Sequence, residues 1–199
     1  MKYPNGIKKN YINIKSHSNR GMDLENDIND SNNYYLVNDI AIIHKKPTPI
    51  TINKVDYKSR VDAVIKEAHF KIPSTTDYNG IYKGKYIDFE AKETKSLTSF
   101  PLNNIHKHQI DHLNNIYKHG GIGFIIVRFT KLNKTYLLFI EDLINFINSN
   151  ERVSIPINYF DKYAHIIKEG LIPRLDYLKI LDKKGVWYES KSKKIYKKN

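Results

Sequence analysis

The chain has 199 residues, no cysteine, and 33 Lys and Arg against 21 Asp and Glu, a formal net charge of +12. This length suits one compact domain, and the lack of cysteine excludes disulfides and thiolate metal sites, while the positive charge favours a polyanionic partner such as nucleic acid. We see no apolar run of about 18 residues and no signal peptide, so we expect no membrane partner, no export and a cytoplasmic location.

The first part of the chain combines weak and strong structural signals. Residues 1 to 20 have little apolar surface to bury and predict a flexible basic N-terminal segment. Residues 23 to 37 place apolar side chains near helical spacing, and residues 40 to 44 predict a short strand. Two prolines then introduce a segment, roughly residues 50 to 72, whose apolar residues follow neither the spacing of a helix nor the alternation of a strand. We interpret it as a projecting arm.

This arm interleaves cationic and aromatic side chains, a mixture suited to phosphate contact and base stacking. The candidate DNA-binding residues are Arg60, Lys66, Phe70 and Lys71. The sequence leaves an alternative open, in which the arm is a solvated hairpin and Phe70 packs into the core.

Residues 86 to 92 carry the most informative pattern. Apolar and charged side chains alternate as in a strand, which places Glu90 and Lys92 on one face. A turn-rich segment, residues 73 to 80, precedes this strand, so Asp77 can lie across a hairpin from Glu90. Two converging carboxylates repel each other unless a divalent cation lies between them. Together, Asp77, Glu90 and Lys92 predict metal-dependent cleavage of phosphodiesters. The alternative is an ordinary surface strand with alternating Glu and Lys.

The second half of the chain predicts further helices and strands. A helix should begin near Ser99 and end near Lys118, before a glycine pair. Residues 123 to 129 predict a strand buried on both faces, and residues 135 to 140 predict its neighbour. Helices follow at 141 to 148 and, with a weaker pattern, at 158 to 168, and residues 183 to 199 form a basic C-terminal tail. This order indicates an α/β fold with a mixed sheet.

Gln109 lies on the predicted helix line that should face the sheet. Its amide oxygen could complete the oxygen shell of a metal, or backbone groups could satisfy the amide. The region is also rich in histidine, but residue 109 is Gln where a zinc-protease helix carries Glu, so zinc catalysis is disfavoured. We expect a solvated histidine face formed by His106, His108, His112 and His119.

Several segments together resemble the RecU family of Holliday junction resolvases, in the PD-(D/E)xK nuclease superfamily. The resemblance covers most of residues 20 to 180, in the segments GM (21–22), NDIA (38–41), HKKPTPI (44–50), PSTTDYNG (73–80), IDFEAKETK (87–95), TSFPL (98–102) and PRLDY (173–177). It implies a nuclease domain over residues 21 to 182 with a restriction-endonuclease-like mixed β-sheet flanked by helices, from which the arm projects as a stalk. It also implies a homodimeric, Mg²⁺-dependent endonuclease that acts on four-way junction DNA, and it suggests a recombinase partner.

The family pattern implies metal ligands at Thr75, Asp77, Glu90 and Gln109 and a transition-state stabiliser at Lys92. Each position carries the expected residue type. Asp88 shares the face of Glu90 and could support the ligands or bind a second metal. Two other functions remain open: a metal-dependent nuclease acting on other DNA structures, and a non-catalytic basic protein that binds nucleic acid.

Overall fold

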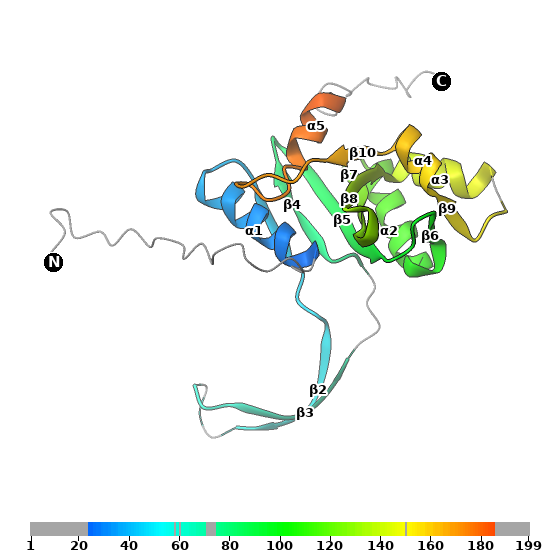
Figure 1. Cartoon of the computed structure of the whole chain (residues 1–199). Coiled ribbons are helices and arrows are strands. Elements are labelled where there is room, and N and C mark those ends of the chain that lie inside the picture. Colours follow the sequence, from blue (N-terminus) through cyan, green and yellow to red (C-terminus); the bar gives the residue numbers. More distant parts are fainter. Residues whose placement is uncertain (1–23, 58, 60, 71–74, 150, 186–199) are drawn as a thin grey trace, which may run out of the picture.

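The computed structural model describes residues 24–57, 59, 61–70, 75–149 and 151–185. A six-stranded mixed β-sheet lies at its centre with helices on both faces, and a two-stranded hairpin projects from this body (Figure 1). This arrangement confirms the mixed α/β fold with a projecting stalk that the sequence predicted.

The central sheet is built around two parallel strands. β5 (Lys85–Thr94) and β7 (Ile122–Phe129) run parallel, and α2 (Lys107–Lys118) makes the crossover between them. Every other neighbouring pair in this sheet is antiparallel. The spatial order is β1 (Ile42–Lys45), β4 (Tyr78–Tyr82), β5, β7, β8 (Lys134–Phe139) and β10 (His165–Ile167).

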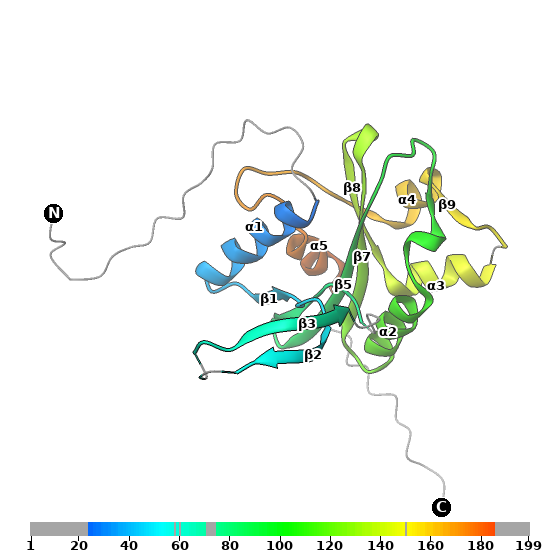
Figure 2. The same cartoon turned by 90° about the horizontal axis from the view of Figure 1, so that it is seen from below.

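Two layers of helices cover opposite faces of this sheet (Figure 2). One face carries α1 (Leu24–Val37) and α5 (Leu178–Lys184), and the other carries α2, α3 (Ile140–Ser149) and α4 (Ile157–Tyr163). Each face has its own group of buried apolar side chains. β7 is buried along its whole length, as predicted for a strand covered on both faces.

The packing of β5 sets the direction of its charged side chains. The buried Phe89 ring stacks between two other rings, with centroid distances of 4.8 Å to Tyr78 and 4.7 Å to Phe124. These three rings belong to the core group on the α1 and α5 face. Because successive strand side chains alternate, Asp88 and Glu90 point to the opposite face, which α2 covers.

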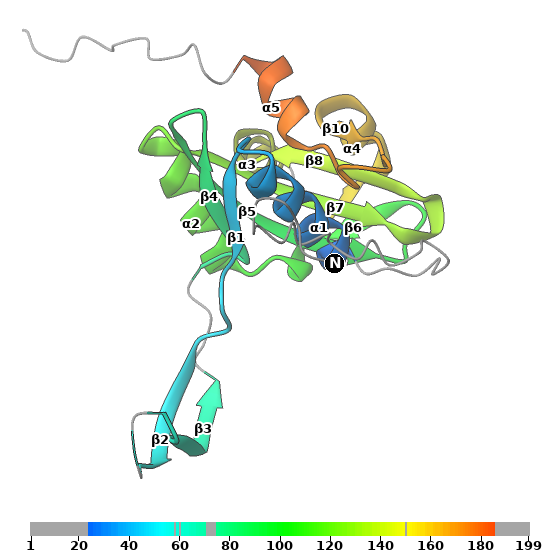
Figure 3. The same ribbon diagram turned by 90° about the vertical axis from the view of Figure 1, so that its left-hand side faces the viewer.

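The hairpin of β2 (Ile50–Asp56) and β3 (Val64–Phe70) stands away from the central sheet (Figure 3). Ile50 pairs with Phe70 at its base, and the register is irregular around Asn53. All of β3 is exposed, and β2 has only one half-buried residue, Thr51. Most apolar side chains of this arm are therefore exposed to solvent, and no third strand pairs with the hairpin among the described residues.

The predicted helix start at Ser99 is wrong. Residues 99–101 form β6 (Ser99–Pro101), which pairs antiparallel with β9 (Ser154–Pro156), and a short 3-10 helix, η1 (Leu102–Asn104), follows. Phe100 and Ile155 lie opposite each other and are fully buried. This long-range packing outweighs the local Ser-Phe-Pro signal, and α2 begins only at Lys107.

Other predicted helices and strands are present, but some begin or end at residues other than those expected. The helix expected over residues 158–168 ends at Tyr163, and the residues that follow form β10 beside β8. The helices predicted at 23–37 and 141–148 are present, and the strand expected at 40–44 lies at 42–45. Helix α5 and the 3-10 helix η2 (Thr130–Leu132) were not predicted.

Two predicted terminal segments lie wholly or partly outside the described residues. The basic N-terminal segment, residues 1–20, and residues 186–199 of the basic tail fall there. Among the helices of the described ranges, none is long and apolar enough to span a membrane.

Candidate active site

Glu90 and Lys92 form an ion pair on the charged face of β5. Glu90 Oε1 lies 2.5 Å from Lys92 Nζ. The Glu90 side chain is fully buried, whereas 26% of the Lys92 side chain is exposed. The ammonium group therefore stands at the boundary between a buried carboxylate and solvent.

Asp77 reaches the same place from the neighbouring strand. β4 and β5 pair with Tyr78 opposite Phe89, so Asp77, one residue before β4, falls opposite Glu90. The Asp77 backbone N–H donates a hydrogen bond to Glu90 Oε2 at 3.1 Å. The structure thus brings together the two acids and the lysine of the sequence pattern.

Burial raises the pKa of Glu90 from 4.5 to about 7. The Asp77 side chain raises this pKa as well, while the Lys92 ammonium lowers it. A buried carboxyl that titrates near neutral pH is typical of functional sites. A cation between Asp77 and Glu90 would remove the repulsion between the two carboxylates.

Gln109 lies buried near the start of α2. The helix runs antiparallel to β5 because it leads into the parallel strand β7. His112 contacts Asp88, so Gln109, almost one turn earlier, lies toward Glu90 along the strand. Gln109 Oε1 accepts a hydrogen bond from the His106 backbone N–H at 2.9 Å. The amide thus has a backbone partner, and its oxygen keeps a second lone pair for a metal.

The donor set fits a hard divalent cation. Asp77 and Glu90 supply carboxylate oxygens, and the half-buried Thr75 and the buried Gln109 supply neutral oxygens. Glu90 Oε1 is buried and, apart from its ion pair with Lys92, has no hydrogen bond within the described ranges. Those ranges contain no group of three or more His, Asp or Glu residues that could hold a metal, so neutral oxygens would have to complete the shell.

Asp88 is surrounded by protein donors. Its buried carboxylate accepts a hydrogen bond from Lys46 Nζ at 2.9 Å and another from the Tyr86 hydroxyl at 2.8 Å, both on Oδ2. The Thr76 hydroxyl donates to Oδ1. His112 Nε2 lies 3.2 Å from Oδ2.

The expected solvated histidine face is therefore wrong for His112, which turns toward the sheet and contacts the buried Asp88 carboxylate. His106 and His119 are exposed, as expected. His108 is half-buried, and its ring stacks on that of His106 with centroids 5.4 Å apart.

Of the candidate DNA-binding residues, the two that the structure describes lie on the hairpin, which stands away from the central sheet (Figure 3). Lys66 and Phe70 lie on β3, and Arg60 and Lys71 lie outside the described residues. Phe70 is 77% exposed, so the alternative in which it packs into the core is wrong. Lys66 Nζ lies 3.7 Å from Asp56 Oδ2 in an exposed ion pair.

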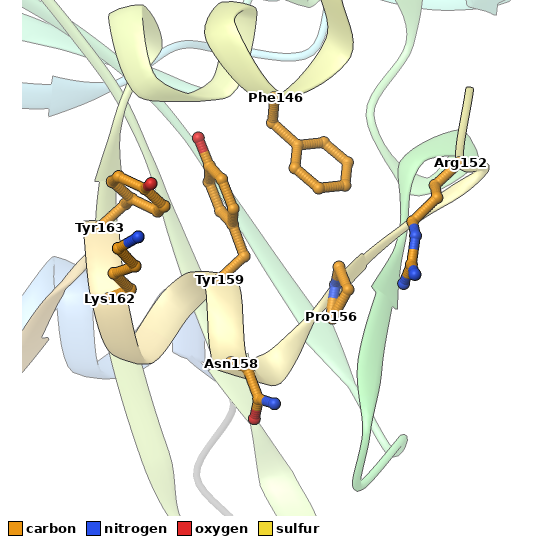
Figure 4. A pocket seen from close by; sticks show the side chains of 7 residues that line it. All are labelled: Phe146, Arg152, Pro156, Asn158, Tyr159, Lys162 and Tyr163. Carbon is orange, nitrogen blue, oxygen red and sulfur yellow. The ribbon is translucent and has the colours of Figure 1, made fainter. Parts of the chain in front are cut away.

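A surface cavity of about 360 Å³ lies elsewhere, around α3, β9 and α4 (Figure 4). Three aromatic rings and two cationic side chains contribute to its lining, which consists of Phe146, Arg152, Pro156, Asn158, Tyr159, Lys162 and Tyr163. These residues do not belong to β4, β5 or α2. The cavity is therefore separate from the carboxylate site.

Besides His112, which was expected in solvent, sequence reasoning missed three partners of Asp88. Tyr86 shares its strand face, so the alternating pattern could have identified it. Thr76 directly precedes Asp77 in the turn-rich segment. Lys46 gives no local signal, because 42 positions separate it from Asp88.

Comparison with known proteins identifies the family of this chain. The family model described as Recombination protein U (RecU) matches residues 19–183. The chain is 50% identical to the proteins named Holliday junction resolvase RecU of Bacillus cereus (strain B4264), Bacillus mycoides (strain KBAB4) and Bacillus anthracis (strain CDC 684 / NRRL 3495), over 92% of this chain and 96% of each relative. The solved structure of the Holliday junction resolvase Hjc of Archaeoglobus fulgidus is 12% identical, with a TM-score of 0.32, and covers 49% of this chain and 75% of that one. The family match and the 50% identity confirm the resemblance seen in the sequence motifs: the chain belongs to the RecU family.

Proposed function

We propose that this chain is a Mg²⁺-dependent, structure-specific endonuclease that resolves Holliday junctions by paired symmetric cuts in recombination and DNA repair. The observation that carries the proposal is the convergence of Asp77, Glu90 and Lys92 in a chain whose relatives are named Holliday junction resolvases. The net charge of +12 supports a DNA substrate.

In this proposal Asp77 and Glu90 hold the cation, and Thr75 and Gln109 complete or orient its oxygen shell. Magnesium is the expected ion because each of these side chains offers oxygen. When bound, the ion supplies Lewis-acid activation of water and neutralises charge on the scissile phosphate.

Lys92 has a separate role in the same step. Negative charge grows on the non-bridging phosphate oxygens as the pentacovalent state forms, and a fixed ammonium group stabilises that charge. Glu90 holds this ammonium in place at 2.5 Å before the substrate arrives. Lys92 in turn lowers the pKa of Glu90 and so favours the ionised carboxylate that a metal requires.

A two-fold symmetric homodimer is part of the proposal. A four-way junction presents two equivalent phosphodiesters, and both must be cut to release two duplexes. Each chain contributes one acid, acid, lysine set from its described residues, so an isologous dimer supplies the second by symmetry. The proposal also includes a recombinase as a further partner and a cytoplasmic location.

Cleavage of matched DNA substrates tests the proposal. Four-way junction, linear duplex and single-stranded DNA would each be incubated with the protein in Mg²⁺ and in EDTA. We expect paired cuts in the junction, in Mg²⁺ only. Equal cutting of all three substrates would indicate a nuclease of other specificity, and DNA binding without any cutting would indicate a non-catalytic protein.

A further inference from the structure

Asp88 lies at the centre of a buried polar network beside the candidate ligands. Its side chain has no exposed surface. An ionised carboxylate has about four acceptor positions. The donors that surround it come from four separate side chains, those of Lys46, Thr76, Tyr86 and His112. Three of these donors share Oδ2 and Thr76 binds Oδ1, so both oxygens of this buried carboxylate already have protein partners.

Two of these donors connect Asp88 to the segment that carries Asp77. Thr76 donates to Asp88 Oδ1, and its hydroxyl accepts a hydrogen bond from Lys46 Nζ at 3.0 Å. The Lys46 backbone N–H donates to the Asp77 carbonyl oxygen at 2.7 Å. Because Thr76 lies between Thr75 and Asp77, these bonds fix the backbone of two candidate ligands relative to β5.

A third donor connects Asp88 to α2. His112 Nε2 lies 3.2 Å from Asp88 Oδ2, and the His112 side chain is 24% exposed. Gln109 lies three residues earlier on the same helix, almost one turn away. A helix moves as a rigid unit over this distance, so the contact at His112 helps to set where Gln109 lies relative to Glu90.

We propose that Asp88 is a positioning residue of the nuclease site, which holds Asp77, Glu90 and Gln109 in their mutual arrangement through Thr76, Lys46 and His112 and does not itself bind the cation. This inference rests on the proposed Mg²⁺-dependent cleavage. Side chains that orient metal ligands typically contribute about 10- to 100-fold to metal affinity or activity.

Asp88→Asn tests the inference, because it keeps the shape of the side chain while removing its charge and one acceptor oxygen. Asp27→Asn is the matched control. Asp27 is equally buried and accepts hydrogen bonds from Arg128 at 2.5 Å and Arg174 at 3.2 Å, and it lies on α1, on the opposite face of the sheet. Mn²⁺ binding to the full chain would be measured by calorimetry, beside thermal unfolding, junction binding in EDTA and junction cleavage.

We expect Asp88→Asn to weaken Mn²⁺ binding by about 10- to 100-fold with an unchanged number of bound ions, and to slow cleavage. Junction affinity in EDTA should stay within about twofold, since phosphate contacts elsewhere supply it. The control should lower the unfolding temperature and leave Mn²⁺ affinity unchanged.

Two further variants keep the test decisive if Asp88→Asn does not fold. His112→Phe removes one donor and should weaken Mn²⁺ binding, whereas His112→Gln retains a donor and should restore part of the affinity. Unchanged Mn²⁺ affinity in both Asp88→Asn and His112→Phe would overturn the inference. So would the loss of one bound ion in Asp88→Asn, which would make Asp88 a ligand, or an equal loss of affinity in Asp27→Asn. A wild-type protein that binds Mn²⁺ but does not cut junctions would instead refute the proposed function.

Discussion

The backbone N–H of Asp77 donates a hydrogen bond to Glu90 Oε2, at 3.1 Å. One oxygen of Glu90 is thus oriented by the peptide of the residue with which it would share a cation. The other oxygen faces Lys92. Because both contacts come from within the chain, the carboxylate is held in one orientation before metal or DNA binds, and such preorganisation lowers the cost of assembling a reactive site.

Alanine substitutions at Glu90 and Lys92 should each remove most of the cleavage activity. Loss of the Lys92 ammonium should slow cleavage by about 10²- to 10³-fold, as for other lost donors to a developing oxyanion. Junction binding should persist, because phosphate contacts elsewhere supply the affinity. Single-turnover cleavage in Mg²⁺ and a gel-shift titration in Ca²⁺ would measure the two effects.

A suitable control for these variants is Glu93→Gln. Glu93 lies on the same strand but on the opposite face, where its carboxylate accepts a hydrogen bond from the Leu24 backbone N–H. Its substitution should leave the cleavage rate within about threefold, in contrast to a loss of about 10² at Glu90. Near-normal cutting by Glu90→Ala or Lys92→Ala would remove these residues from the site.

The raised pKa of Glu90 predicts opposite effects of pH on stability and on metal binding. The pKa is about 7 in the folded chain and near 4.5 when unfolded, so the folded state binds the proton more tightly. This contribution to stability is fully present below about pH 4.5 and is lost as pH rises through about 7. Metal binding should strengthen over the same window, because a ligand carboxyl must be ionised.

Calorimetric unfolding between pH 5 and 8, with and without Mg²⁺, would measure both effects. Stabilisation by Mg²⁺ should grow with pH in the wild type, since a ligand that binds only the folded state raises its stability. Glu90→Gln cannot ionise and should lack both trends. Parallel pH profiles for the wild type and Glu90→Gln would show that Glu90 does not titrate in this range.

Phe70→Ala should impair junction cleavage without destabilising the fold. The ring is 77% exposed on β3, so truncating it leaves no cavity, and base stacking on such a ring contributes about 1–3 kcal/mol. Leu171→Ala is a matched control, because Leu171 is 74% exposed and lies outside the hairpin. Junction cleavage, junction affinity and unfolding temperature would be measured for both; a large drop in unfolding temperature for Phe70→Ala alone would mean that the ring packs within the protein.

Mixed dimers of wild type and an inactive variant should distinguish paired cutting by two coupled sites from independent cutting by single chains. If two symmetric sites act on one junction, mixing wild type with excess Glu90→Ala should give mixed dimers that nick one strand and leave the junction unresolved. Supercoiled plasmid carrying an extruded cruciform would report this directly, since nicking relaxes it and paired cutting linearises it. Linear product at the wild-type ratio would exclude the dimer mechanism.

Local patterns predicted the elements whose side chains alternate or repeat along one strand or helix. The period-2 pattern of β5 placed Glu90 and Lys92 on one face, and antiparallel pairing placed Asp77 opposite Glu90. Local patterns failed where distant segments decide the structure. Ser99 begins a strand instead of a helix because Phe100 pairs with Ile155, far along the chain.

The difference between local patterns and contacts of distant segments also explains which contacts of the candidate site the sequence did not predict. The sequence suggested that Asp88 could assist the ligands, but not that Lys46 and His112 contact it, since these come from separate segments. His112 was expected in solvent because helix periodicity does not reveal a buried acid on a neighbouring strand. Such polar contacts follow from tertiary packing and have no period in the sequence.

The hairpin is connected to the carboxylate site through both of its ends. β2 begins four residues after Lys46, and β3 ends five residues before Thr75. Lys46 and the Thr75–Asp77 segment are also hydrogen-bonded to each other. If one duplex of a DNA junction displaced or twisted the hairpin, it would therefore also move the two chain segments that carry these residues. Recognition of a bent or branched DNA shape far from β5 would in this way be coupled mechanically to the geometry of Asp77 and Glu90, the carboxylates proposed to hold the cation.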